Sequence, residues 1–128
     1  MHVTKDDVNV RLNVPGAVLR QTPNFGSVRG YDKMSAEYFS LSAGVDTTPL
    51  CQGLEGNQCS SPHWGYIIKG KVTVTNAKGE KETLKANDLF FWAAGHNVKV
   101  DEDADIIMFS PQDEHGKVID HIVERMKH

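Results

Sequence analysis

The sequence predicts an all-β fold, a sandwich or barrel of short strands with one α-helix at its C-terminal end. Residues 63–110 contain six short segments of strand character separated by turn residues, and short strands at regular spacing are typical of such folds. After residue 110 the apolar side chains recur with a helical period instead. A chain of 128 residues is long enough to form one domain with its own core.

The first half of the chain is less regular. Residues 8–14 alternate apolar and polar side chains, which is the pattern of a half-buried strand. Residues 15–33 are rich in proline and glycine, so we expect turns with short extended pieces there. Residues 36–42 predict another strand. Residues 43–62 show almost no periodicity, and so long a loop in a compact domain is usually functional or disordered.

The second half predicts a dense series of strands. We expect them at residues 63–69, 72–75, 81–84, 89–92, 97–100 and 104–110. Residues with strong turn preference stand between them, at 70–71, 76–79, 86–88, 93–95 and 101–103. This series is the main reason for predicting a barrel or sandwich.

The C-terminal segment predicts a helix over about residues 111–127. Ser110 suits the N-cap, and Pro111 suits the first helical position. The apolar side chains that share one helical face are Val118, Ile119, Ile122, Val123 and Met126. We expect this stripe to pack on the barrel or on a second subunit.

Composition narrows the class of partner. The net charge of −3 at pH 7 offers no basic patch for nucleic acid or for an anionic membrane surface. No stretch approaches the length of apolar chain that a membrane span needs, and the first residues lack an apolar signal region. We therefore expect a cytoplasmic protein, in which Cys51 and Cys59 are free thiols or metal ligands rather than a disulfide.

Residues 57–110 contain two motifs that resemble those of the cupin superfamily. In the first motif of that family, two histidines and a glutamate precede a glycine at fixed spacing. Counted back from Gly70, the glutamate position holds His63, the second histidine position holds Cys59 and the first holds Asn57.

The second motif corresponds to residues 87–96. His96 follows the glycine directly, and Val98 occupies the usual ligand position. A closer resemblance is to small cupins with a Pro-His-Trp-Gly-Tyr stretch, here residues 62–66, a later Gly-His pair and a Phe-Ser-Pro ending. The resemblance implies a cupin-type β-barrel, a double-stranded β-helix or jelly roll. Residues 1–128 would then form a single domain, with a barrel core at about 34–110.

Three side chains are candidate metal ligands. Side chains two or four residues apart share a face of an extended strand, so Asn57, Cys59 and His63 could point the same way. If that face and the face of His96 both point inward, a thiolate and two imidazoles converge in an apolar cavity. Cys59, His63 and His96 would suit Zn or Fe and would leave a coordination position open.

Three functions stay open at this point. In the first, the metal serves an enzyme acting on a small molecule, and the resemblance implies an isomerase, a lyase or a dioxygenase. In the second, the barrel is a metal-free module that binds or senses a small molecule. In the third, Cys59 is a free nucleophile or redox sensor. For each we expect a homodimer, because the first strand and the terminal helix offer surfaces that a second copy would cover.

The remaining polar and aromatic residues receive structural interpretations. The residues nearest in sequence that could orient the imidazoles are Asn57, Gln58, Tyr66 and Asn97. Four histidines are not expected to be ligands, because they lie on or beside the polar face of the predicted helix or at a chain end: His2, His115, His121 and His128. With His63 inward, Trp64 and Tyr66 should face outward, whereas one or more of Phe90, Phe91 and Trp92 should line the interior. The acidic residues 101–105 predict a solvated turn.

Overall fold

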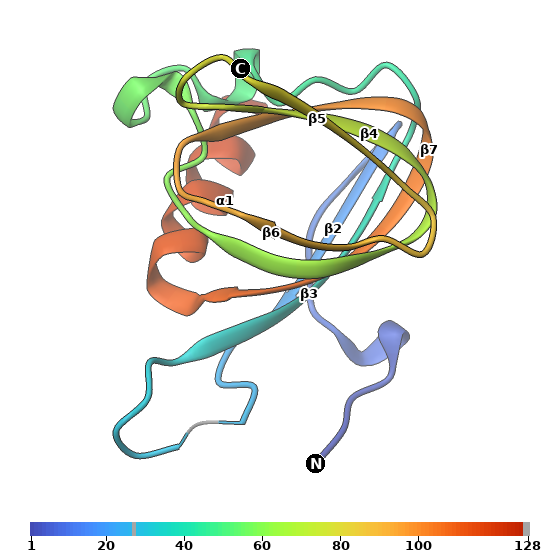
Figure 1. Ribbon diagram of the computed structural model, residues 1–128. Helices are drawn as coiled ribbons and strands as arrows, with labels where there is room; N and C mark the ends of the chain where they lie inside the picture. The colour runs from blue at the N-terminus through green and yellow to red at the C-terminus, as the bar shows by residue number, and fades with distance from the viewer. Residues whose placement is uncertain (27, 127–128) are drawn as a thin grey trace.

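The computed structural model describes residues 1–26 and 28–126. Its strands are β1 (Val10–Val14), β2 (Ala17–Thr22), β3 (Met34–Leu41), β4 (His63–Asn76), β5 (Lys81–Lys85), β6 (Leu89–Trp92) and β7 (His96–Pro111). The helix α1 spans Gln112–Met126, and the short 3₁₀ helices are η1 (Lys5–Asp7), η2 (Pro49–Cys51) and η3 (Glu55–Asn57). The strands curl around an interior, and α1 lies along one side of it (Figure 1). None of the described helices is long and apolar enough to cross a membrane.

The strands form one antiparallel sheet that curls without closing. Its order is β1-β2-β3-β7-β4-β5, and β6 pairs with the opposite edge of β4 from β7. Strand β2 occupies a region where the sequence predicted only turns with short extended pieces. Because β1 and β5 lie at the two ends of the order, the barrel is completed by side chains and by α1 rather than by a continuous ladder.

Strands β4 and β7 are longer than predicted. Each joins two predicted strands, and the turns expected at residues 70–71 and 101–103 are bends within them. Pairing shifts register at this bend, where Gly70 has a φ of 91°. A Cβ atom at Gly70 would lie 2.1 Å from the carbonyl oxygen of Asp103, so only glycine lets the strands approach this closely.

The curl of the β4–β7 ladder brings its two ends together. Trp64 pairs with Phe109 at one end of the ladder, and Asn76 pairs with His96 at the other. A straight ladder of this length would separate those ends by about 40 Å. The ring centroids of His63 and His96 nevertheless lie 5.0 Å apart.

Helix α1 begins one residue later than predicted. Pro111 is the last residue of β7, and Ser110 does not cap the helix, because its hydroxyl donates to the buried carboxylate of Glu37. Most of the apolar stripe packs on the barrel, with Val118 and Ile119 almost fully buried, whereas Met126 is exposed. Residues 127 and 128, at the end of the predicted helix, lie outside the described residues.

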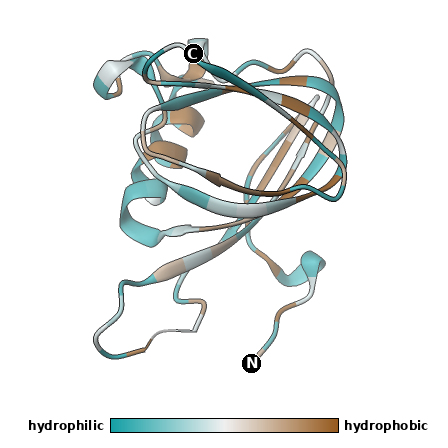
Figure 2. Ribbon diagram, in the orientation of Figure 1, coloured by the Kyte–Doolittle hydropathy of each residue, from teal (hydrophilic) through white to brown (hydrophobic). Residues whose placement is uncertain are grey.

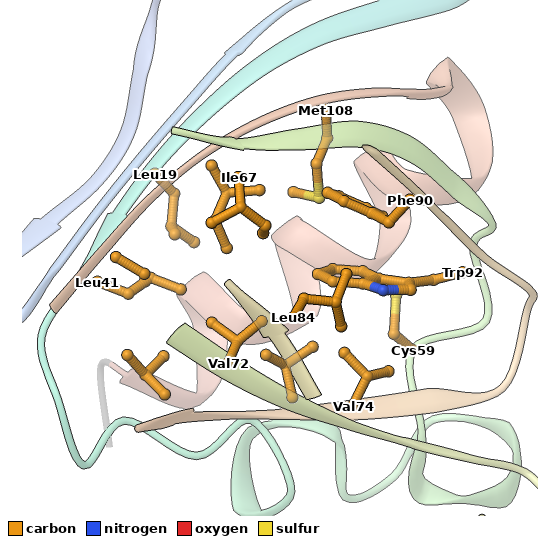
Figure 3. Close-up of a cluster of buried hydrophobic side chains, with 14 of the residues drawn as sticks. Leu19, Leu41, Cys59, Ile67, Val72, Val74, Leu84, Phe90, Trp92 and Met108 are labelled. Atoms are coloured by element: carbon orange, nitrogen blue, oxygen red, sulfur yellow. The ribbon is translucent and has the colours of Figure 1, made fainter. Parts of the chain in front are cut away.

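The core fills the space inside the curled sheet. Hydrophobic residues gather on the strands that face the interior and on part of α1, whereas most connecting loops are hydrophilic (Figure 2). Ile67, Val72 and Ile106 are at most 1% exposed. Figure 3 shows aliphatic side chains in one part of the core and the rings of Phe90 and Trp92 in another, with Cys59 labelled nearby.

Candidate metal centre

A small cavity lies inside the barrel, between the sheet and α1. Its volume is about 60 Å³, which is room for a few water molecules or a ligand group of a few atoms. Most of its lining is apolar, including Phe39, Leu41, Val98, Ile106, Met108 and Val118. The polar side chains on its wall include Cys59, His63, His96 and His115. An apolar cavity with a few convergent polar groups is the usual form of a small-molecule site.

Cys59 is held opposite His96 by the backbone. The amide of Cys59 donates to the carbonyl of His96 at 2.8 Å, and the amide of Gly95 donates to the carbonyl of Cys59 at 2.7 Å. The Cys59 side chain is buried, and its Sγ lies 3.4 Å from Nε2 of His63. This bridge fixes the end of the long irregular loop against the start of β7.

The backbone also fixes the ring of His96. Its Nδ1 lies 2.8 Å from the carbonyl oxygen of Ala93, and since a carbonyl only accepts, Nδ1 carries the hydrogen. The Nε2 atom of the neutral ring therefore keeps its lone pair. His96 is 3% exposed and lines the cavity.

The tautomer of His63 follows from a chain of hydrogen bonds. Ser110 Oγ donates to Glu37 Oε1 at 2.6 Å and lies 2.6 Å from Nδ1 of His63. A hydroxyl has one hydrogen, which here goes to the carboxylate, so Nδ1 of His63 must donate to Ser110. The Nε2 lone pair of His63 is left facing Cys59.

The three side chains fit a transition metal. One ligand atom from each of Cys59, His63 and His96 can be chosen so that all three lie within 4.8 Å of one another. Both imidazoles hold their hydrogens on Nδ1 and turn Nε2 lone pairs away from those partners. Sulfur plus two imidazole nitrogens is a donor set that Zn²⁺ prefers and Fe²⁺ tolerates.

Burial keeps these groups neutral. It raises the pKa of the Cys59 thiol to about 12 and lowers the pKa of His96 to about 4. The pKa of His63 falls well below its ordinary value, first because of burial and then because of His115 and His96 nearby. A cation at this site would therefore have to displace one proton, from Cys59. The same raised pKa disfavours Cys59 as a free nucleophile, because thiolate is scarce near neutral pH.

Glu37 belongs to the site but was not singled out from the sequence. It is 2% exposed, and its carboxylate accepts hydrogen bonds from Ser110, Gln21, Ser35 and His115. These four hydrogen bonds compensate for the removal of the carboxylate from water. The available signal was the alternation in β3, which puts a carboxylate on the same inward face as two large apolar residues.

The interpretation of His115 as a residue of the polar helix face is wrong. His115 is 3% exposed, and its ring centroid lies 4.2 Å from that of His63. The reason is helical spacing: residue 115 stands three, four and seven positions before the buried residues 118, 119 and 122. His121 instead bonds the carbonyl of Gln52 at 2.7 Å, outside the cavity. His2 is exposed, and His128 lies outside the described residues.

The residues expected to orient the imidazoles form no hydrogen bond with either ring among the described residues. Asn57 is exposed on η3, because the chain is not extended there. The side chain of Gln58 donates to the backbone carbonyl of Asn76, and the hydroxyl of Tyr66 donates to the side chain of Asn87. The side chain of Asn97 donates to the backbone carbonyl of residue 57. Ser110 and the carbonyl of Ala93 orient the two rings instead.

The aromatic residues divide as the strand alternation predicted. Phe90 and Trp92 are buried and stack with ring centroids 3.9 Å apart, whereas Phe91 and Trp64 are about half exposed. Trp92 lines the cavity, although its indole N–H has no hydrogen-bond partner among the described residues. The predicted acidic turn is exposed at residues 101–103.

Comparison with known proteins places the fold. No family model and no curated protein matches the sequence. Among solved structures, ectoine synthase from P. lautus is 11% identical, with a TM-score of 0.59, covering 87% of this chain and 78% of that one. The polyketide cyclase RemF from Streptomyces resistomycificus is 17% identical, with a TM-score of 0.57 and the same two coverages. An RmlC-like cupin from Shewanella frigidimarina is 14% identical, with a TM-score of 0.57, covering 85% of this chain and 88% of that one.

At these identities the likeness speaks for the fold. It confirms the predicted all-β architecture with a C-terminal helix, and the shared fold is the one that the two motifs implied. Function has to be argued from the side chains in the cavity.

Proposed function

We propose that this chain, which has the cupin fold, binds a Zn²⁺ or Fe²⁺ ion through Cys59, His63 and His96 and holds a small molecule in the adjoining cavity. The observation that carries the proposal is the convergence of one buried sulfur and two Nε2 lone pairs. Three protein ligands would leave a coordination position for water or for a ligand atom.

Hydrogen bonds within the protein orient both imidazole rings in the absence of an ion. His96 is fixed by the carbonyl of Ala93, and His63 is fixed by Ser110, which is itself held by Glu37. Cys59 would give up its proton on binding. A bound ion of this kind polarises a carbonyl oxygen or lowers the pKa of a water molecule. The apolar wall keeps bulk water away from these groups.

The class of reaction belongs to this proposal as well. Ectoine synthase and the polyketide cyclase are enzymes by name and share this fold. Isomerase, lyase and dioxygenase chemistry on a small molecule fits a metal at the wall of a mostly apolar cavity. A substrate of a few heavy atoms, or the reactive end of a larger one, would suit the space.

One observation favours a second function, a metal-free binding or sensing module. The 3.4 Å contact between Cys59 Sγ and His63 Nε2 can be a thiol hydrogen bond, which satisfies both groups without an ion. The neutral state of all three side chains agrees with this alternative.

Metal content decides between the two functions. Protein purified without a histidine tag or chelator should contain nearly one Zn or Fe per chain by elemental analysis. A His63→Ala, His96→Ala double variant should contain none, whereas His121→Ala, which alters a histidine outside the cavity, should match the parent. Folded parent protein without metal, even after incubation with Zn²⁺ or Fe²⁺, would support the metal-free module.

We also propose a homodimer and a cytoplasmic location. Most of the apolar face of α1 packs within the barrel, so a second copy would cover the exposed aromatic side chains on the outer face of β4, β6 and β7. Trp64 and Phe91 lie there with ring centroids 5.2 Å apart, and Phe109 pairs beside Trp64. Light scattering at micromolar concentration tests the dimer, and a monomer would contradict it.

A further inference from the structure

The hydrogen-bonded pair of Glu37 and His115 is a second polar group at the cavity, outside the three-residue ligand set. The two residues come from distant parts of the chain, β3 and α1. Both side chains are buried, and Nδ1 of His115 bonds Oε2 of Glu37. His115 lines the cavity beside His63.

This pair does not form a second cation site. Glu37, His63 and His115 do offer ligand atoms within 4.8 Å of one another. The carboxylate oxygens, however, already accept four hydrogen bonds, and Nδ1 of His63 carries a hydrogen for Ser110. An ion there would break these bonds at both ends.

The second ring nitrogen of His115, Nε2, is available to bind a ligand. Since Nδ1 donates to Glu37, Nε2 is the remaining hydrogen-bonding atom of the ring. Among the described residues no side chain or backbone group bonds this nitrogen. The carboxylate behind the ring fixes its orientation, as an anchored histidine requires for directed hydrogen bonding.

We propose that Nε2 of His115 binds the small molecule through a hydrogen bond with its hydroxyl group. The inference rests on the proposed function, in which a carbonyl oxygen of the same molecule could take the coordination position that the three protein ligands would leave open. The 4.2 Å separation of the His63 and His115 rings puts both groups on one side of the cavity. The substrate class is then a small hydroxy-carbonyl compound, and its carbon skeleton meets the apolar wall.

Two neutral probes of equal size test this contact. Hydroxyacetone carries a carbonyl and a hydroxyl group, and butanone replaces that hydroxyl with a methyl group. Dissociation constants are measured by NMR titration, and metal content is determined for every sample. We expect the parent protein to bind hydroxyacetone about five- to tenfold more tightly than butanone, because one hydrogen bond contributes about that factor.

His115→Asn is the informative variant, since its amide can still donate to Glu37 but no nitrogen stands at the Nε2 position. The preference for hydroxyacetone should disappear in this variant, with butanone affinity unchanged. His121→Asn, on the same helix outside the cavity, should keep the preference. A preference that survives in His115→Asn, or no preference in the parent, would overturn the inference.

A second measurement does not depend on the variant folding. In parent protein labelled with ¹⁵N-histidine, hydroxyacetone should shift the Nε2 resonance of His115 and butanone should not. Equal shifts from both probes would count against the contact. The titrations are run with and without metal, so absence of metal contradicts the proposed function while His115 is still tested in the empty cavity.

Discussion

Ser110 accepts a hydrogen bond from Nδ1 of His63 at 2.6 Å while its own hydrogen goes to a buried carboxylate. The serine therefore decides which nitrogen of the histidine faces the cavity. Glu37 forms hydrogen bonds with this hydroxyl and with His115, so the outer residues are as much part of the site as the ligands.

The Ser110→Ala variant should bind metal more weakly. Without the hydroxyl, the ring of His63 loses the acceptor that fixes its tautomer, and loss of such a partner typically costs ten- to a hundredfold in affinity, roughly. Competition with a chromophoric chelator measures the change. Ser42→Ala, at an exposed position, is the matched control, and equal affinity in both variants would contradict the role of Ser110.

Alkylation of Cys59 in metal-free protein should stay slow up to high pH. A thiol with a pKa of about 12 has about a thousandfold less thiolate at pH 8 than one with a pKa of 9. Its labelling rate should keep rising between pH 9 and 12, whereas the unfolded chain should level off above pH 9. Mass spectrometry after iodoacetamide treatment measures both. Rapid labelling of the folded protein at pH 8 would revive the free-thiol function.

Metal-free protein should lose stability between pH 6.5 and 4. Since the pKa of His96 falls to about 4 on folding, the unfolded chain binds a proton in this range that the native state does not. The free energy of unfolding therefore decreases as pH falls, by about 3 kcal/mol from this group at pH 4. Urea unfolding at several pH values measures the slope. His96→Gln should flatten it relative to His121→Gln, and identical slopes would refute the assignment.

Two glycine substitutions should act in opposite directions. A Cβ atom at Gly65 would lie 2.3 Å from the carbonyl oxygen of Ile107 and 2.4 Å from the ring of Phe90, so Gly65→Ala should destabilise the fold by about 3 kcal/mol. In α1, a Cβ atom at Gly116 meets nothing within 4 Å, and Gly116→Ala should stabilise by about 0.5–1 kcal/mol. Thermal unfolding checks both. A neutral Gly65→Ala would mean that β4 and β7 can separate locally.

The sequence predicted the strands and the helix better than it predicted where they begin, end or join. Turn residues at 70–71 and 101–103 looked like chain reversals, because a bend within a strand uses the same glycine and acidic residues as a turn. The start of α1 was misplaced by one residue for a related reason. Ser110 has the chemistry of a helix cap, and only the fold shows that a buried carboxylate takes its hydrogen instead.

Cys59, His63 and His96 could be grouped from the sequence because local alternation and motif spacing both point to them. Glu37 and His115 could not, since each approaches the cavity from a part of the chain with no motif. A buried carboxylate is improbable until its four donors are known, and those donors come from β2, β3, β7 and α1. Long-range pairing of this kind leaves little trace in a single sequence.

The curl of the β4–β7 ladder gives the proposed ion a mechanical role. His63 and His96 lie at opposite ends of that ladder. An ion bound by both would therefore cross-link the two ends of the ladder. This cross-link can form only after the sheet has bent, so the ion would add little to the folding rate. Opening the sheet would require release of the ion. The main effect of ion binding should therefore be a longer lifetime of the folded chain.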